Sequence, residues 1–187
     1  GDYAVANLNA DFIILDDGYQ HWQLARDLDV VLIDSINVFG NNYLLPRGTL
    51  REPLTHLDRA HAFLLTRSDQ ATDDARDVIR DTLGRYNDQA LVVGSVHNPR
   101  CFIEIAEWYK GVRPETVALE AVCGKRVLPF SALGNPSSFE QTIAGLGAAV
   151  VGSVRYPDHH DYTMAEMQEV MQKAVDCQAY ALATTEK

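Results

Sequence analysis

Residues 62–93 have the sequence AFLLTRSDQATDDARDVIRDTLGRYNDQALVV, in which two apolar runs enclose a polar segment. The runs at 62–65 and 90–93 are uninterrupted, as is typical of strands that are covered on both faces. Between them, residues 69–86 carry apolar side chains at helical spacing, at Ala75, Val78, Ile79 and Leu83. This order of strand, helix and strand predicts a parallel sheet with a helix packed against it.

Two more apolar runs lie upstream of this stretch. Residues 12–15 (FIIL) and 30–33 (VVLI) are predicted to be buried strands of the same sheet. We therefore predict that residues 1–94 form a first α/β lobe with a parallel sheet.

Residues 95–125 break this pattern. Two short strand-like runs, at 102–108 and 116–119, surround a turn-like sequence KGVRP at 110–114. These features predict a β-hairpin that links the first lobe to a second one.

A second, smaller α/β lobe is predicted from residue 126 to residue 187. Its strands are expected at 127–130, 149–151 and 180–184. One helix is expected to begin at Ser137 or Ser138. Another is expected to begin at Thr163, where Glu166 completes a capping-box pattern.

The composition excludes several classes of protein. A net charge of −10 argues against binding to nucleic acid, because phosphate neutralisation needs clustered Lys and Arg. No apolar run approaches the ~20 residues that span a bilayer, and the first residues do not resemble a signal peptide. Cys101, Cys123 and Cys177 form no CxxC pair, which argues against metal knuckles and fits a reducing compartment. We expect the chain to be part of a longer protein.

The acidic stretch DDGYQH, residues 16–21, follows the first predicted strand. Open α/β sheets bind ligands at the carboxyl ends of their strands, and Mg²⁺ prefers one or two carboxylates together with phosphate oxygens. Asp16 and Asp17 are therefore candidate metal ligands, and Gln20 and His21 are polar groups beside them. A plain polar turn has the same composition, so the residues alone leave both interpretations open.

A second polar stretch, DHHD at residues 158–161, also follows a predicted strand. A histidine can accept the proton of a sugar hydroxyl, and a neighbouring carboxylate can orient its ring. The four ionisable groups could instead bind a metal. A solvated loop packed on Tyr156 and Tyr162 is an equally good explanation of these residues.

The third stretch, NNYLLPRGTLREP at residues 41–53, is a long connection for a compact domain, and such loops are usually functional or disordered. Arg47 and Arg51 could contact phosphate, and Glu52 could reach a metal. A surface loop held by its prolines is also consistent with this sequence. The phosphate-binding pattern GxxxxGK[ST] is not present in these 187 residues.

Taken together, these stretches resemble the tetraacyldisaccharide 4'-kinase family. The similar stretches occur in the family's order at residues 16–21 (DDGFQH in the family), 39–53 (FGNGxLLPAGPLREP), 132–136, 156–163 (FPDHHxFT) and 185–187 (the start of TEKDAVK). Arg47 and Thr49 stand where the family has Ala and Pro.

The resemblance implies two α/β/α lobes joined by a hairpin, the first an incomplete lobe of the P-loop type. It implies transfer of the γ-phosphate of ATP to the 4'-hydroxyl of a lipid A disaccharide 1-phosphate precursor, with Mg²⁺. The enzyme would act at the cytoplasmic face of the bacterial inner membrane. The phosphate loop and the segment that contacts the membrane surface would lie upstream of residue 1, so we expect these 187 residues alone to be inactive.

The resemblance also implies roles for residues at the metal and the nucleotide. Asp16 and Asp17 match the family's acidic pair at the metal, and Glu52 matches an acidic residue near the same centre. The predicted nucleotide contacts are Asp16, Asp17, Gln20, His21 and Arg51.

Catalysis is assigned to a second set by the same resemblance. His159 matches the histidine that, with an Asp expected upstream of residue 1, deprotonates the sugar hydroxyl in the family. Asp158 and Asp17 are also predicted to be catalytic. For this chemistry the acidic loop and the histidine loop must meet across one cleft.

Two other functions remain open at this point. Asp158-His159-His160 is also similar to the motif of DHH-type phosphoesterases, in which Asp16, Asp17, Asp27 and Asp29 would have to complete a pair of metals. A degenerate α/β fragment that only binds a partner is the non-enzymatic alternative.

Overall fold

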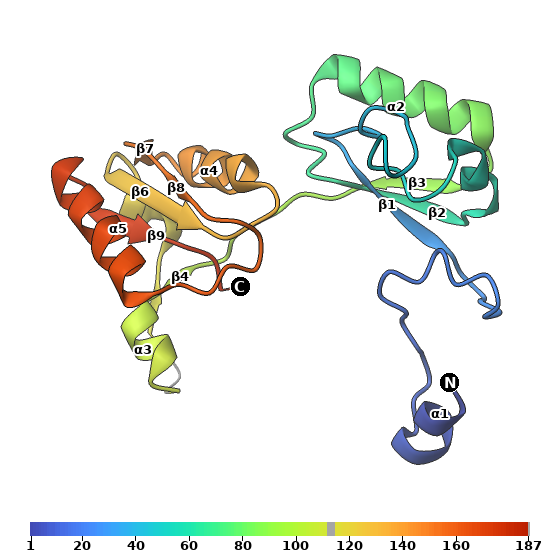
Figure 1. Ribbon diagram of the computed structural model, residues 1–187, viewed down its shortest axis with the longest axis horizontal. Helices are drawn as coiled ribbons and strands as arrows, with labels where there is room; N and C mark the ends of the chain where they lie inside the picture. Colours follow the sequence, from blue (N-terminus) through green and yellow to red (C-terminus); the bar gives the residue numbers. More distant parts are fainter. Residues whose placement is uncertain (112–114, 187) are drawn as a thin grey trace. The chain divides into compact units, whose positions relative to one another are not determined.

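The computed structural model describes residues 1–111 and 115–186. The chain divides into two compact units, with the boundary between Val96 and His97. Both units combine parallel strands with helices, so the predicted mixed α/β class is confirmed (Figure 1). In the described part of the chain, no helix is long and apolar enough to cross a bilayer.

The first unit is built on a three-stranded parallel sheet. Its strands are β1 (Val30–Asp34), β2 (Ala62–Thr66) and β3 (Leu91–Gly94), hydrogen-bonded in this order. Helix α2 (Asp73–Tyr86) connects β2 to β3, as the spacing of its apolar residues predicts. Three of the four predicted strands of this lobe are thus confirmed.

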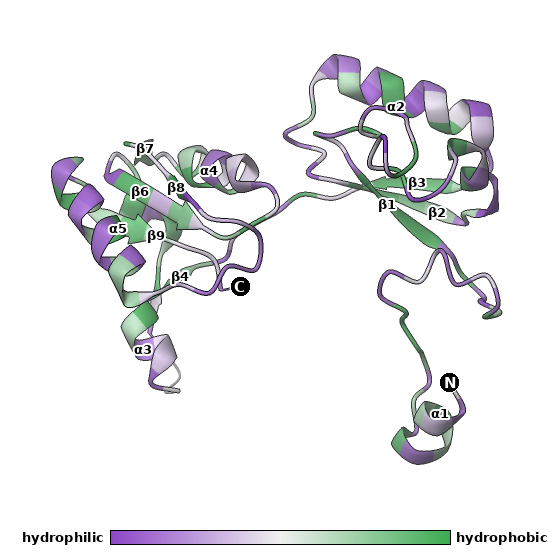
Figure 2. Ribbon diagram, viewed as in Figure 1, coloured by the Kyte–Doolittle hydropathy of each residue, from purple (hydrophilic) through white to green (hydrophobic). Residues whose placement is uncertain are grey.

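The core of the first unit lies between the sheet and α2. Phe63 from β2 is fully buried there, against Ile33 from β1 and Ile79 and Leu83 from α2. The short 3₁₀ helix η1 (Leu54–Arg59) adds Leu57 to this cluster. Polar residues occupy the outer surface of α2, which is visibly amphipathic in Figure 2. Burial of one apolar stripe is what holds such a helix on its sheet.

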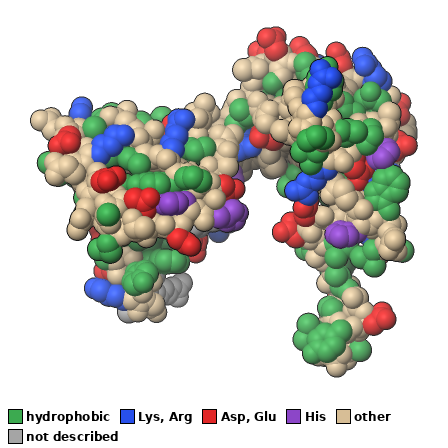
Figure 3. Space-filling model, in the orientation of Figure 1, with side chains coloured by type: hydrophobic (Ala, Val, Ile, Leu, Met, Phe, Trp, Pro, Cys, Tyr) green, Lys and Arg blue, Asp and Glu red, His purple; other side chains and the backbone are tan. Residues whose placement is uncertain are grey.

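The predicted strand at residues 12–15 is wrong. This segment forms no ladder with a described strand, and Phe12 and Ile14 are 90% and 92% exposed. A strand needs a neighbour to pair with its backbone N–H and C=O groups, and apolar content cannot replace that neighbour. Helix α1 (Asp2–Leu8), which precedes this segment, has no buried residue either, and Figure 3 shows hydrophobic side chains on its surface.

The segment after the unit boundary differs in part from the predicted hairpin. Strands β4 (Phe102–Ile103) and β5 (Thr116–Val117) pair antiparallel as predicted, but each has only two residues. Helix α3 (Ile105–Tyr109) occupies most of the predicted first strand. The backbone N–H of Trp108 donates to the carbonyl of Glu104 at 3.0 Å, so local helical bonds replace a longer ladder. Residues 112–114 of the predicted turn lie outside the described residues.

The second unit is built around β6 (Arg126–Ser131), whose residues from Val127 onward are buried. It pairs in parallel with β7 (Ala149–Val150), β8 (Val154–Arg155) and β9 (Ala181–Ala183). The short 3₁₀ helix η2 (Leu119–Val122) contributes Val122 to the core beside β6. The three predicted strands of this lobe are confirmed, each within one or two residues.

Helices α4 (Pro136–Gly145) and α5 (Met164–Asp176) complete the second unit. The side chain of Asn135 caps α4 by accepting from the N–H of Ser138 at 3.2 Å, so the prediction of a serine cap is wrong. Pro136 explains the difference, because its missing N–H and restricted φ suit the first helical position. The capping box at the start of α5 is confirmed.

Candidate active site

The acidic loop turns sharply at Asp16 and Asp17, and both side chains are exposed. Asp17 adopts a left-handed backbone, with φ of 54°. A Cβ at Gly18 would lie 2.6 Å from the Cβ of Leu15, so only glycine fits there. Exposed carboxylate oxygens on a tight turn suit Mg²⁺, which takes few protein ligands and keeps several waters.

Asp17 forms an ion pair with Arg51, which lies 34 positions further along the chain. This pair joins the acidic loop to the Arg51-Glu52 segment. Both side chains are more than half exposed, so solvent screens the pair and it contributes little to stability. Two predicted site residues are therefore neighbours, held together weakly enough to separate for a ligand.

Glu52 is held much more firmly than Asp17. One of its oxygens accepts from Trp22 Nε1 at 3.2 Å and Arg59 Nη2 at 3.0 Å. The other accepts from Arg59 Nη1 at 2.7 Å and lies 2.9 Å from His56 Nδ1. Burial alone would raise the pKa of Glu52, but the hydrogen bonds from Arg59, His56 and Trp22 outweigh it and lower the pKa to about 2. A metal at Glu52 would have to displace at least one of these partners.

Tyr19, in the acidic loop, contacts two of the residues that bind Glu52. Its hydroxyl donates to the carbonyl of His56 at 2.6 Å, and its ring lies 3.7 Å from the guanidinium of Arg59. Burial, which outweighs the nearby positive charge of Arg59, raises the pKa of Tyr19 to about 12. The Tyr19 hydroxyl therefore stays protonated and keeps its hydrogen bond to the backbone carbonyl of His56.

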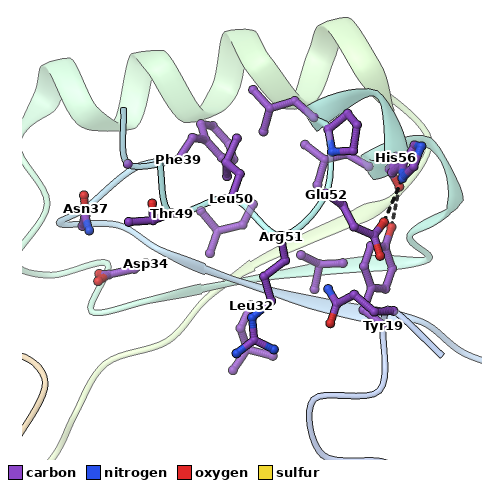
Figure 4. A pocket seen from close by; sticks show the side chains of 17 residues that line it. Tyr19, Leu32, Asp34, Asn37, Phe39, Thr49, Leu50, Arg51, Glu52 and His56 are labelled. Carbon is purple, nitrogen blue, oxygen red and sulfur yellow. Dashed lines mark hydrogen bonds and ion pairs between the residues drawn. The ribbon is translucent and has the colours of Figure 1, made fainter. Parts of the chain in front are cut away.

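A cavity of about 290 Å³ opens beside this network, within the first unit. Gln20, Arg51 and Glu52 line it, whereas Asp16, Asp17 and His21 do not. Figure 4 shows Tyr19, Glu52 and His56 gathered at one end of the pocket, with Asp34, Asn37 and Thr49 toward the other. The structure therefore brings three predicted residues to one cavity and leaves His21 exposed outside it.

The second predicted loop belongs to the second unit. His159 adopts a left-handed backbone with φ of 59°, and its side chain is 73% exposed. Its Nε2 lies 3.8 Å from Asp158 Oδ2, which is ion-pair distance but too long for a hydrogen bond. Asp158 does accept a hydrogen bond from the backbone N–H of His159 at 3.1 Å. The imidazole therefore projects into solvent, where a hydroxyl can approach it.

His160, in contrast, is part of the framework of this loop. Its ring stacks on Tyr156 with centroids 4.9 Å apart, and its Nε2 lies 2.9 Å from Glu166 Oε1. The other oxygen of Glu166 accepts from the N–H and the hydroxyl of Thr163, both at 2.8 Å. The capping box of α5 thus also anchors the residue that follows His159.

Glu166 makes the free energy of unfolding of the second unit depend on pH. Hydrogen bonds from the Thr163 N–H, His160 and the Thr163 hydroxyl lower the pKa of Glu166 to about 2. Since the folded pKa is below the usual 4.5, its stabilisation is complete above pH ~4.5 and is lost as the pH falls toward 2. We expect Glu166→Gln to lower the melting temperature at pH 6, with the difference from wild type shrinking as the pH falls and disappearing below pH 2.

Circular dichroism melts at pH 6, 4 and 2.5 measure this difference. Glu169→Gln is the matched control, because Glu169 is an exposed glutamate on the same helix. A Glu166→Gln difference that persisted unchanged at pH 2.5 would contradict the assignment.

The residues of the described ranges include no group of three or more His, Cys, Asp or Glu placed to hold a metal. Asp29, one of the residues that a phosphoesterase would need, is paired with Arg26 at 2.8 Å. The acidic loop lies in the first unit and the histidine loop in the second.

Sequence reasoning missed the Trp22, His56 and Arg59 side chains that surround Glu52. His56 and Arg59 follow Glu52 by four and seven residues, close to helical spacing, and this was the only signal available.

Comparison with known proteins identifies the family. The profile of the family described as "LpxK: Tetraacyldisaccharide-1-P 4'-kinase" matches residues 1–187. The chain belongs to the tetraacyldisaccharide 4'-kinase family. The resemblance drawn from the motifs is thereby confirmed, and the comparisons favour the kinase over the phosphoesterase.

Several relatives in this family are close. The tetraacyldisaccharide 4'-kinase of Anaeromyxobacter sp. (strain Fw109-5) is 44% identical over 184 residues, which cover 98% of this chain and 47% of that protein. The enzyme of Halothermothrix orenii is 38% identical over 192 residues, with 98% and 49% coverage. The chain thus spans about half the length of the curated relatives it matches.

A solved structure supports the same relationship. The "apo" form of LpxK from Aquifex aeolicus, in complex with ATP, matches with a TM-score of 0.57 and 28% identity. The match covers 86% of this chain and 45% of that one.

Proposed function

We propose that the protein to which this chain belongs transfers the γ-phosphate of ATP to the 4'-hydroxyl of a lipid A disaccharide 1-phosphate precursor. The observation that carries this proposal is the family match over all 187 residues. The pocket lined by Gln20, Arg51 and Glu52 supports it, because phosphoryl transfer needs oriented polar groups more than covalent chemistry.

The acidic loop is proposed to bind the nucleotide side of the reaction. Asp16 and Asp17 present exposed oxygens to a Mg²⁺ ion, which when bound neutralises charge on the phosphates. Arg51 gives up its ion pair with Asp17 and binds a phosphate oxygen instead. Gln20 and His21 contact the nucleotide. Glu52 remains at the pocket, where it would serve as a further metal ligand or stay bound to Arg59.

The histidine loop is proposed to bind the acceptor side. The imidazole of His159 accepts the proton of the 4'-hydroxyl while the sugar oxygen bonds to the γ-phosphorus. The bond from phosphorus to the bridging β-oxygen breaks, and ADP leaves with that electron pair. Asp158 stabilises the imidazolium that forms. This scheme requires the two units to place their loops on one cleft.

The acceptor also suggests where the reaction occurs. A tetraacylated disaccharide stays in a bilayer because its chains are apolar, while ATP is supplied from the cytoplasm. We therefore propose the cytoplasmic face of the inner membrane as the site of action, with contact through a segment outside these residues.

A transfer assay tests the proposed function. The full-length protein with Mg²⁺ and [γ-³²P]ATP is expected to label the 4'-position of a tetraacyl disaccharide 1-phosphate. The 187-residue chain alone is expected to give no labelled product, because it has no GxxxxGK[ST] sequence to hold the phosphates.

Two results would overturn these expectations. Mn²⁺-dependent hydrolysis of a phosphodiester without ATP, by the full-length protein, would favour the phosphoesterase. Labelling by the isolated chain would show that the missing phosphate loop is not needed.

A further inference from the structure

Arg59 is the point at which three segments of the first unit meet. It lies at the end of η1, and its Nη2 donates to the backbone carbonyl of Tyr19 in the acidic loop at 2.7 Å. The same guanidinium donates to both oxygens of Glu52. One side chain therefore ties the acidic loop and the Arg51-Glu52 segment to a single short helix.

The chemistry of this junction suits arginine specifically. A guanidinium has five donors in a rigid plane, so it can bind a carboxylate with two parallel bonds and still reach a carbonyl. Its flat face also packs on aromatic rings, here 3.7 Å from the ring centre of Tyr19 and 4.8 Å from that of Trp22. A lysine ammonium is compact and cannot make these contacts together.

Burial gives the junction its rigidity. The Glu52 side chain is 12% exposed and that of Arg59 is 25% exposed, whereas the Asp17–Arg51 pair nearby is mostly in solvent. Charged hydrogen bonds of this kind are stronger than exposed ion pairs. The Arg59 junction is thus firm, and the Asp17–Arg51 pair is loose.

We propose that Arg59 is a positioning residue, which holds the acidic loop against the Arg51-Glu52 segment so that the nucleotide and metal groups are set before ligand binds. This inference rests on the proposed kinase function. Arg59 touches no reacting atom in the scheme above and acts only through Tyr19 and Glu52. Residues that hydrogen-bond to metal ligands and orient them typically contribute 10- to 100-fold to metal affinity or to activity.

The test uses the full-length kinase with Arg59→Lys and Arg59→Ala. We expect both changes to lower kcat/KM for MgATP by about 10- to 100-fold and to raise the Mg²⁺ concentration needed for half-maximal activity. The KM for the lipid acceptor is expected to change by less than about twofold, since the histidine loop belongs to the other unit. Added guanidinium ion should restore part of the MgATP activity of Arg59→Ala. Calorimetry with a non-hydrolysable MgATP analogue should show the same loss in affinity.

Arg80→Ala is the matched control, because it also removes a guanidinium that pairs with a carboxylate in the same unit, at 2.7 Å from Asp77. It is expected to leave all these values unchanged. If Arg59→Ala does not fold, the result for Arg59→Lys decides whether Arg59 has a positioning role, since lysine keeps the positive charge.

The possible outcomes separate this inference from the proposed function. An inactive wild-type protein would reject the kinase proposal itself. An active wild type with an unchanged Arg59→Lys variant would reject the positioning role alone. Equal losses for both substrates, without rescue by guanidinium, would show that Arg59 only stabilises the fold.

Discussion

Replacing His159 with alanine in the full-length kinase is expected to lower kcat by ~10²–10⁴-fold, the usual contribution of a general base. His159 is suited to this role because its imidazole projects into solvent and lies near the carboxylate of Asp158. Little stability should be lost, since a side chain that is mostly exposed contributes little to folding.

His159→Gln and His97→Ala complete this experiment. Glutamine keeps a hydrogen-bonding group but cannot accept the proton, so we expect it to be as impaired as alanine. His97 is an exposed histidine outside both candidate loops, and its replacement is expected to have no effect. A His159→Ala enzyme whose kcat stayed within about twofold of wild type would exclude His159 as the base.

Asp17→Asn is the second change with a large expected effect. Asparagine has nearly the same shape and tolerates the left-handed backbone found at Asp17, so the turn should be preserved. The negative charge that pairs with Arg51 and that we assign to the metal is removed. We expect kcat/KM for MgATP to fall by ~10²-fold or more, which initial rates at varied MgATP measure.

Asp77→Asn is a closely matched control for this change. Its side chain is 64% exposed, as is that of Asp17, and it also pairs with an arginine. Both variants should lose little stability, because solvent screens exposed ion pairs. An Asp17→Asn enzyme with normal kcat/KM would remove Asp17 from the nucleotide site. Asp16→Asn, made in parallel, would then show whether the neighbouring carboxylate carries the metal.

Local patterns in the chain predicted several elements correctly. Helix α2 follows from apolar residues such as Ile79 and Leu83 at helical spacing, and α5 from the Thr163–Glu166 capping box. These signals involve residues within one or two turns of one another, so they do not depend on distant parts of the chain.

The residues of the candidate site were named from the sequence, but their arrangement was not. Arg51 and Glu52 were predicted to contact phosphate and metal, and both line the pocket. Only the near-helical spacing of His56 and Arg59 indicated that they could reach Glu52, and nothing indicated Trp22. The residue types alone did not distinguish the two histidines of the DHHD stretch, and only the family resemblance selected His159. In the structure His160 stacks on Tyr156, whereas His159 points outward.

By itself the sequence determined the family, the α/β class, the main helices and the identity of the polar loops. Tertiary structure alone decided that residues 12–15 are exposed, that Asp17 meets Arg51, and which donors surround Glu52. The physical reason is that helices and caps form from bonds between near neighbours. Strand pairing, burial and ion pairs across loops depend instead on groups tens of residues apart, which only the folded chain brings together.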